Sequence, residues 1–160
     1  MRACILASAS PRRREILTNL GIPFTVFATD TDETTAETDP ARLAEELSAR
    51  KGRAALAALH AAGTDTAGKV VIASDTTVFC AGEILGKPRD ADDARRMLRL
   101  LSGRRHEVVS GIWISLDGRE AVSHAVTAVE FDPLTDADIA AYLATGEPFG
   151  KAGAYAIQGR

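Results

Sequence analysis

Short apolar runs alternate with longer amphipathic stretches along this chain, and this alternation constrains its fold more than any other feature. Alternating strands and helices are typical of an α/β fold, and a late pair of strands around a turn indicates a mixed sheet. The expected strands are residues 3–7, 24–28, 69–79, 83–85, 106–116 and 120–131. The expected helices are residues 11–20, 40–62, 91–101 and a helix that Thr135 caps and that reaches Ala144. We therefore predict a mixed β-sheet flanked by helices.

The length of 160 residues suits one globular domain, and we expect residues 1–160 to form it. The apolar runs are too short to span a membrane, and the first residues lack the segment order of a signal peptide. Cys4 and Cys80 provide neither a disulfide framework nor a metal cluster. These features favour a cytoplasmic protein. A net charge of −3 argues against general nucleic-acid binding but is compatible with a small anionic ligand.

The segment Ser8–Arg14 combines small hydroxyl residues with successive arginines at the expected start of a helix. The amide groups at a helix N-terminus attract anions, and guanidinium groups suit phosphate oxygens. Arginine is otherwise unfavourable there because the helix dipole repels it, so this conflict indicates a functional demand. Taken alone, the segment is equally compatible with a capped helix whose basic first turn is solvated.

Lys51 falls on the apolar stripe of the expected helix 40–62, four residues from both Leu47 and Ala55. An ammonium group on an inward helix face must either extend to solvent along its neighbours or bind an anion. The residues alone leave both interpretations open.

Asp75 interrupts an apolar strand near its C-terminal part. Carboxylates are unfavourable in strands and in cores, and sites in α/β proteins usually form at strand ends. A carboxylate there can bind a divalent metal or take a proton from water, although a buried structural aspartate is the alternative. Asp32 and Glu33, in the acidic segment 29–39, could join Asp75 around a metal or merely keep that loop solvated.

Two weaker candidates lie further along the chain. Lys87 belongs to a rigid Gly-Lys-Pro turn, where a solvated lysine is the simpler interpretation. The glycine-rich stretch 146–160 allows the backbone to approach a ligand closely, and the amide of Gln158 can donate to and accept from the edge of a base. A flexible surface loop would have a similar composition.

In this order along the chain, these segments resemble the Maf family of nucleoside triphosphate pyrophosphatases. The collinear motifs that carry the resemblance are ILASASPRRREIL, DTDET, AEELSARKGRA, VVIASDTTVF, GEILGKPRDADDARRMLRLLSGRRHEVVSG, LTDADIAAYLATGEP and KAGAYAIQG. Within the family, SDTTV and AYAIQG are similar to the branch that acts on dTTP and UTP. A neutral pyrimidine suits the amide of Gln158.

The resemblance implies hydrolysis between the α- and β-phosphates of dTTP or UTP, which gives a nucleoside monophosphate and pyrophosphate. It also implies a divalent cation such as Mg²⁺, Mn²⁺ or Co²⁺ and a fold like that of inosine-triphosphate pyrophosphatases, with two lobes and a central cleft. A homodimer is common in the family, and neither nucleic acid nor a membrane is an expected partner. Family members usually continue beyond the last motif, so we expect residues 1–160 to lack the family's C-terminal segment.

The resemblance further assigns roles to individual residues. Asp75 would be the general base or a metal ligand, Glu33 would assist with metal or water, and Lys51 would serve catalysis. The phosphates would be bound by Ser8, Arg12, Arg13, Lys51 and Lys87. Base selection would fall to Thr76, Gln158 and one of Arg12 and Arg13.

Other functions fit the same residues. One is a pyrophosphatase with purine preference, like the inosine-triphosphate enzymes. Another is a nucleotide-binding regulator of cell division or septum formation without turnover. A third is an inactive fragment of such an enzyme.

Overall fold

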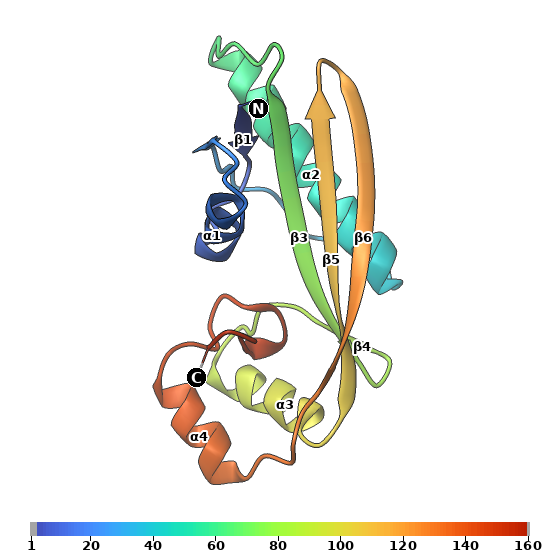
Figure 1. The fold of residues 1–160 in the computed structure, drawn as a ribbon. Coiled ribbons are helices and arrows are strands. Elements are labelled where there is room, and N and C mark those ends of the chain that lie inside the picture. Colours follow the sequence, from blue (N-terminus) through green and yellow to red (C-terminus); the bar gives the residue numbers. More distant parts are fainter. Residues whose placement is uncertain (1–2, 160) are drawn as a thin grey trace. The chain divides into compact units, whose positions relative to one another are not determined.

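The computed structural model describes residues 3–159, and within them it contains a six-stranded mixed sheet and four α-helices (Figure 1). The predicted α/β class is confirmed. The strands are β1 (Cys4–Leu6), β2 (Phe24–Val26), β3 (Val70–Cys80), β4 (Glu83–Leu85), β5 (Arg105–Leu116) and β6 (Arg119–Glu130). The helices are α1 (Pro11–Asn19), α2 (Pro40–Ala61), α3 (Ala91–Leu101), α4 (Asp136–Ala144) and the short 3-10 helix η1 (Ala152–Ala154).

The strands follow the order β2-β1-β3-β5-β6, and β4 pairs with β3. β1 is parallel to both of its neighbours, with Ile5 opposite Thr25 on one side and Val71 on the other. Parallel neighbours need crossover connections, which contain α1 and α2 here. β4 returns antiparallel to β3, with Leu85 opposite Val78. The sheet is therefore mixed, as predicted.

The chain forms two compact units, and their boundaries fall inside β3, β5 and β6. The first unit contains the described residues up to Asp75 together with Ser110–Ala125. The second contains Thr76–Val109 and the described residues from Val126 onward. Two units agree with the two lobes that the family resemblance implies.

In the first unit, α2 packs closely against β5 because two glycines remove the side chains that would hold them apart. A Cβ at Gly52 would lie 2.0 Å from the Trp113 ring, and one at Gly111 would lie 2.1 Å from the carbonyl oxygen of Ala44. Trp113 is buried, and its Nε1 donates to Glu120 at 3.1 Å. The close packing of α2 on β5 sets the distance of α2, and hence of Lys51, from the sheet.

In the second unit, α3 and α4 pack over a core that includes Leu98, Leu101 and Ile139. Beside this core, the rings of His106, Phe131 and Tyr155 meet edge to face, with centroids 4.8–5.5 Å apart. The imidazole of His106 is 2% exposed. The second unit thus buries an imidazole between two aromatic rings.

Helix caps explain where most helices begin. Asp39 accepts from the backbone of Ala41 and Arg42 at the start of α2, and Thr135 and Asp138 form the predicted reciprocal capping box of α4. Ser10 occupies the predicted cap position of α1, but its side chain makes no capping bond. Instead, its backbone N–H donates to the hydroxyl of Ser8 at 3.2 Å, so the loop itself is held closed.

One sequence-based expectation about position is wrong. Asp75 does not lie toward the end of its strand but in the middle of β3, an internal strand of the sheet. β3 continues to Cys80 because its last residues are apolar or β-branched and pair with β4. β2 is also shorter than expected and ends at Val26, while residues 29–39 form the predicted loop.

None of the helices within residues 3–159 is long and apolar enough to cross a membrane.

The close contact of α2 with β5 gives a stability prediction. Gly111→Ala should lower the free energy of unfolding by about 1–3 kcal/mol, because the new methyl group meets rigid backbone atoms of α2. Urea denaturation measures this change. Gly86→Ala is the matched control, since nothing lies within 4 Å of a Cβ there. Equal stability of the two variants would contradict the close contact.

The buried His106 gives a pH prediction. Burial lowers the pKa of His106 below its ordinary value of about 6.5, so the unfolded chain binds the proton first as the pH falls. Stability should therefore decrease below about pH 6.5, by at most about 1.4 kcal/mol per pH unit from this group. Denaturation at pH 7.5 and 5.5 tests this, and His106→Gln should lose less stability over that interval. An identical loss in both proteins would show that His106 does not contribute.

Candidate active site

A cluster of charged side chains in the first unit centres on the ammonium group of Lys51. Its Nζ donates to Oδ1 of Asp75 and lies 2.8 Å from Oε1 of Glu33. The side chains of Lys51 and Asp75 are only 18% and 12% exposed. Lys51 therefore faces inward and binds anions, which decides between the two interpretations that the sequence left open.

The main elements of the first unit bring these groups together. Along β3, Val71, Ala73 and Asp75 share the buried face. Lys51 lies beside Gly52, the residue of α2 that packs on Trp113, so its side chain reaches the carboxylate of Asp75. The apolar patterns of β3 and α2 that build the core thus also position the side chains of Asp75 and Lys51 toward each other.

Glu33 lies on the 29–39 loop, and Arg50 of α2 anchors that loop. Its Nη1 donates to the carbonyl oxygens of Asp32 and Thr34, both at 2.8 Å, which are the residues on either side of Glu33. Its Nη2 binds Glu46, four residues earlier on α2, at 2.5 Å. Sequence reasoning missed Arg50 because it lies off the apolar stripe. The Glu46–Arg50 spacing predicts only a pair on the helix surface.

Arg13 and Ser8 extend the cluster. Nη1 of Arg13 donates to the buried Ser8 hydroxyl at 2.9 Å. Burial lowers the pKa of Arg13, and the negative charges of Asp75 and Glu33 counteract this effect. Arg13 thus lies within electrostatic reach of both carboxylates. Arg12, the neighbouring candidate, is partly exposed, and no hydrogen bond or ion pair within residues 3–159 joins it to the cluster.

The carboxylates keep Lys51 charged. Burial by itself would lower the pKa of Lys51, but the hydrogen bonds with Asp75 and Glu33 and their negative charges outweigh it and raise the pKa above its ordinary value. Two cations and two carboxylates therefore share one partly buried region. This arrangement can bind an anion through the cations and hold a proton acceptor beside it.

The carboxylates of Asp75 and Glu33 also fit a divalent metal that needs only one or two ligands from the protein. Within residues 3–159, no group of three or more histidine, cysteine or acidic side chains could hold an ion by itself. Mg²⁺ is commonly bound by one or two carboxylates together with substrate phosphates and water. The carboxylates of Asp75 and Glu33, which both contact Lys51, meet this requirement.

Comparison with known proteins shows the family of the chain. The model of the family described as Maf-like protein matches residues 3–160. The chain belongs to the Maf family. A protein of Symbiobacterium thermophilum named dTTP/UTP pyrophosphatase is 45% identical over 161 residues, covering 100% of this chain and 79% of that protein. One of Moorella thermoacetica with the same name is 48% identical over 163 residues, covering 100% of this chain and 80% of its own length.

A solved structure shows a similar fold. The Ham1 protein of Staphylococcus aureus superposes with a TM-score of 0.52 and 19% identity, over 81% of this chain and 71% of that protein. At this identity the likeness concerns the fold alone, and it agrees with the predicted architecture.

The remaining residues suggested by the Maf resemblance belong to the second unit. Thr76 follows Asp75 on β3 and is half-buried. Lys87 is exposed in the connection between β4 and α3. Gln158 is exposed in a turn that the N–H of Gly159 closes by donating to the carbonyl of Ala156 at 3.1 Å. A backbone bond from Gly153 to Gly86 at 3.1 Å ties the C-terminal segment to the connection that carries Lys87.

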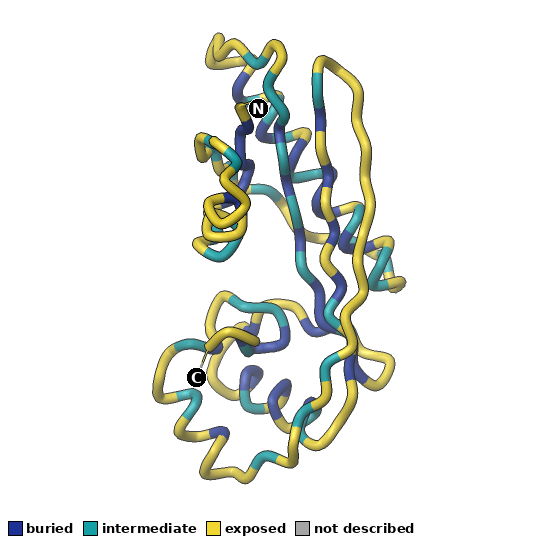
Figure 2. Tube along the Cα trace, in the orientation of Figure 1, coloured by how far each residue is buried: buried dark blue, intermediate teal, exposed yellow. Residues whose placement is uncertain are grey.

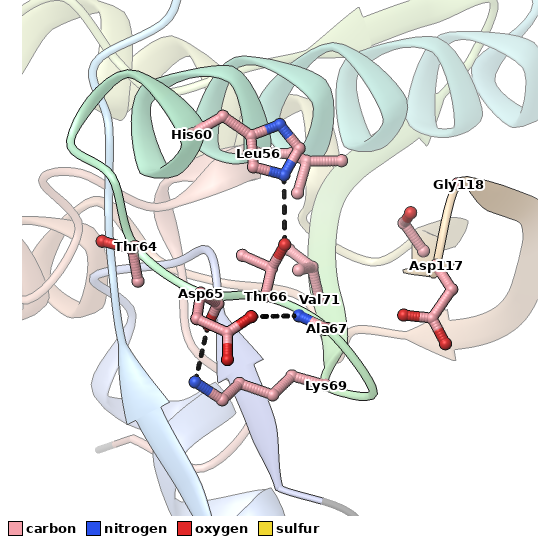
Figure 3. A pocket seen from close by; sticks show the side chains of 11 residues that line it. Leu56, His60, Thr64, Asp65, Thr66, Ala67, Lys69, Val71, Asp117 and Gly118 are labelled. Atoms are coloured by element: carbon pink, nitrogen blue, oxygen red, sulfur yellow. Dashed lines mark hydrogen bonds between the residues drawn. The ribbon is translucent and has the colours of Figure 1, made fainter.

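The cavity of about 420 Å³ in Figure 3 shares no residue with the Lys51 cluster. It lies in the first unit between the end of α2, the following loop and the Asp117-Gly118 turn. Several of its polar groups already bind one another: His60 contacts Thr66 at 3.0 Å, and Lys69 donates to the carbonyl of Asp65 at 2.7 Å (Figure 3). His60 and Lys69 of this cavity are thus already engaged by neighbouring groups.

The electrostatics of the cluster can be tested directly. Asp75→Asn should lower the pKa of Lys51, because the hydrogen bond with Asp75 is the strongest influence that raises it. A titration of the Lys51 side chain by NMR measures the change. Glu33→Gln should lower the pKa less, and Asp65→Asn should leave it unchanged. A Lys51 pKa unaffected by Asp75→Asn would mean that the pair is not formed in solution.

Proposed function

We propose that this chain hydrolyses nucleoside triphosphates, preferably dTTP or UTP, to the monophosphate and pyrophosphate. The observation that carries the proposal is the cluster of Arg13, Lys51, Asp75 and Glu33 in a chain that is 45–48% identical to proteins named dTTP/UTP pyrophosphatase. The cluster combines the cations that a triphosphate needs with the carboxylates that its hydrolysis needs.

Binding of the triphosphate falls to the cations. The substrate carries about four negative charges, and placing it in a partly buried site requires compensating charge. In the proposal, Arg13 donates to phosphate oxygens in an orientation fixed by Ser8, and Lys51 turns from its carboxylates toward the phosphates. Arg12 and Lys87 contribute further positive charge, as the Maf resemblance implies. The same cations stabilise the charge that grows on the departing pyrophosphate.

Asp75 is the proposed general base. Its Oδ1 accepts from Lys51 in the free protein, and in the proposal Lys51 turns toward the phosphates, which leaves the whole carboxylate available to take a proton from water. Substrate binding would thus free the base where the water attacks the α-phosphorus. Glu33 assists by orienting this water, and Arg50 keeps its loop in place.

Asp75 and Glu33 would hold the divalent cation, for which Mg²⁺, Mn²⁺ and Co²⁺ are the candidates. When bound, such a cation neutralises phosphate charge and lowers the pKa of coordinated water. Omission of divalent ions should therefore abolish turnover.

Base selection is proposed to fall to Thr76, Gln158 and one of the two arginines Arg12 and Arg13. The amide of Gln158 both donates and accepts, which matches the neutral edge of a pyrimidine. The Maf resemblance supports this assignment for a chain whose C-terminal motif reads AYAIQG.

A homodimer and a cytoplasmic location complete the proposal. Figure 2 shows β6 exposed along nearly its whole length, and β6 is the last strand in the order of the sheet. Antiparallel pairing of two such strands over their full length would place Arg119 of one copy opposite Glu130 of the other, and in this register the charges are complementary. Light scattering should then give twice the mass of one chain.

A panel of nucleoside triphosphates with a pyrophosphate readout tests the function, with and without Mg²⁺ or Mn²⁺. Release of pyrophosphate from dTTP and UTP is expected. Preference for inosine or xanthosine triphosphate would indicate the purine alternative. Nucleotide binding without pyrophosphate release would overturn the enzymatic proposal and favour a regulatory protein.

The role of Asp75 gives a quantitative prediction. Asp75→Asn should reduce kcat for dTTP by about 10²- to 10⁴-fold while the protein still binds nucleotide, because the amide cannot accept the proton. Steady-state kinetics and calorimetry measure the two effects. Asp65→Asn is the matched control and should keep normal turnover. Near-normal turnover in a folded Asp75→Asn protein would remove Asp75 from the mechanism.

A further inference from the structure

We propose that His106 is a positioning residue for base selection, which it controls by holding Tyr155 and, through Tyr155, the turn that carries Gln158. The inference rests on the proposed function. All the groups involved lie in the second unit; His106 is on β5, and Tyr155 and Gln158 are in the C-terminal segment after α4.

The link between His106 and Tyr155 is direct. Nε2 of His106 lies 2.7 Å from the hydroxyl of Tyr155, and the two rings meet edge to face with centroids 5.5 Å apart. Phe131 packs against both rings, at 5.0 Å from His106 and 4.8 Å from Tyr155. The ring of Tyr155 is thus fixed by packing, and its hydroxyl is fixed by a hydrogen bond.

The surroundings of His106 define which atoms donate. Nδ1 lies 3.4 Å from the carbonyl oxygen of Arg104, which can only accept, so Nδ1 carries the proton. Nε2 then offers a lone pair, and the hydroxyl of Tyr155 donates to it. Burial lowers the pKa of His106 and raises that of Tyr155 to about 12, so both groups stay neutral near pH 7. The bond therefore has one defined direction.

Tyr155 begins the segment that forms the Gln158 turn. The next residue, Ala156, donates from its N–H to the hydroxyl of Tyr142 at 3.2 Å and accepts from the N–H of Gly159 at 3.1 Å. At the other end of the turn, a Cβ on Gly159 would lie 2.0 Å from the Glu147 carboxylate. The turn is therefore held at Ala156 by hydrogen bonds and has no free space beside Gly159, while Gln158 itself is exposed.

A purely structural role does not account for the choice of histidine. A phenylalanine at position 106 would keep the edge-to-face packing and would bury no polar ring, so packing alone favours an apolar residue. Compared with a phenylalanine ring, the imidazole additionally provides a directional acceptor for Tyr155. A directional bond matters where a neighbouring group must keep a fixed position, and Gln158, a group with proposed chemistry, follows Tyr155 by three residues on the same segment.

The test compares base discrimination in variants that keep the aromatic packing. Tyr155→Phe and His106→Phe each remove the hydrogen bond and retain a ring. The ratio of kcat/KM for dTTP to that for dATP should fall by about 2- to 10-fold in each variant, the loss expected from one hydrogen bond. The double variant should lose no more than either single one, because both act through the same bond. His106→Gln, whose amide oxygen can replace Nε2, should restore part of the ratio.

His124→Gln is the matched control, because His124 binds Glu45 at 2.7 Å in the first unit. It should leave the ratio unchanged. Thermal unfolding of every variant separates folding from selection. Variants that are less stable but discriminate normally would overturn the inference and reduce the pair to a structural contact.

Dissociation constants for dTTP and dATP, measured by calorimetry on the same variants, provide a readout independent of turnover. If the wild-type protein releases no pyrophosphate, the proposed function fails, and the ratio of these constants still decides the role of His106. An unchanged binding ratio would then overturn the inference as well.

Discussion

The ion pair of Lys51 with Asp75, completed by Glu33, is the interaction on which the rest of the site depends. Neither Lys51 nor Asp75 could remain largely buried alone without a large desolvation cost, whereas together each compensates the other, and the more exposed Glu33 adds a second negative charge. The pairing requires α2 to lie close to the sheet. Gly52 and Gly111 allow this approach because neither interposes a side chain between α2 and β5. The chemistry of the site therefore depends on the same packing that stabilises the first unit.

The helices and strands could be predicted from sequence because each carries a local signal. Helix α3 has the predicted bounds, and the spacing of Thr135 and Asp138 predicts the start of α4. Asp75 was assigned to the C-terminal part of its strand, although the expected strand 69–79 nearly coincides with β3 and Asp75 lies at its centre. Strand β2 ends two residues earlier than expected, because its hydrogen bonds with β1 decide where it ends and periodicity does not contain them.

The same distinction explains what could be predicted of the site. Residue types at unusual positions, such as a lysine on an apolar stripe, correctly indicated groups that the structure brings together. Sequence could not separate Arg12 from Arg13, because neighbouring helical positions differ only in direction, and direction depends on tertiary packing. Arg50 escaped notice for a related reason: its partners are backbone carbonyls of a loop, which have no signature in the sequence.

The proposed function combines two different recognition problems. A phosphate chain is recognised by charge, which acts over several ångströms and tolerates small shifts of Arg13 or Lys51. A neutral base offers only hydrogen bonds, which weaken steeply when distance or angle changes. An exposed glutamine in a turn has no regular structure to hold it, so its position must be imposed by its neighbours. Burying a neutral imidazole costs free energy. The hydrogen bond by which His106 orients Tyr155 beside that turn explains why a histidine is buried there.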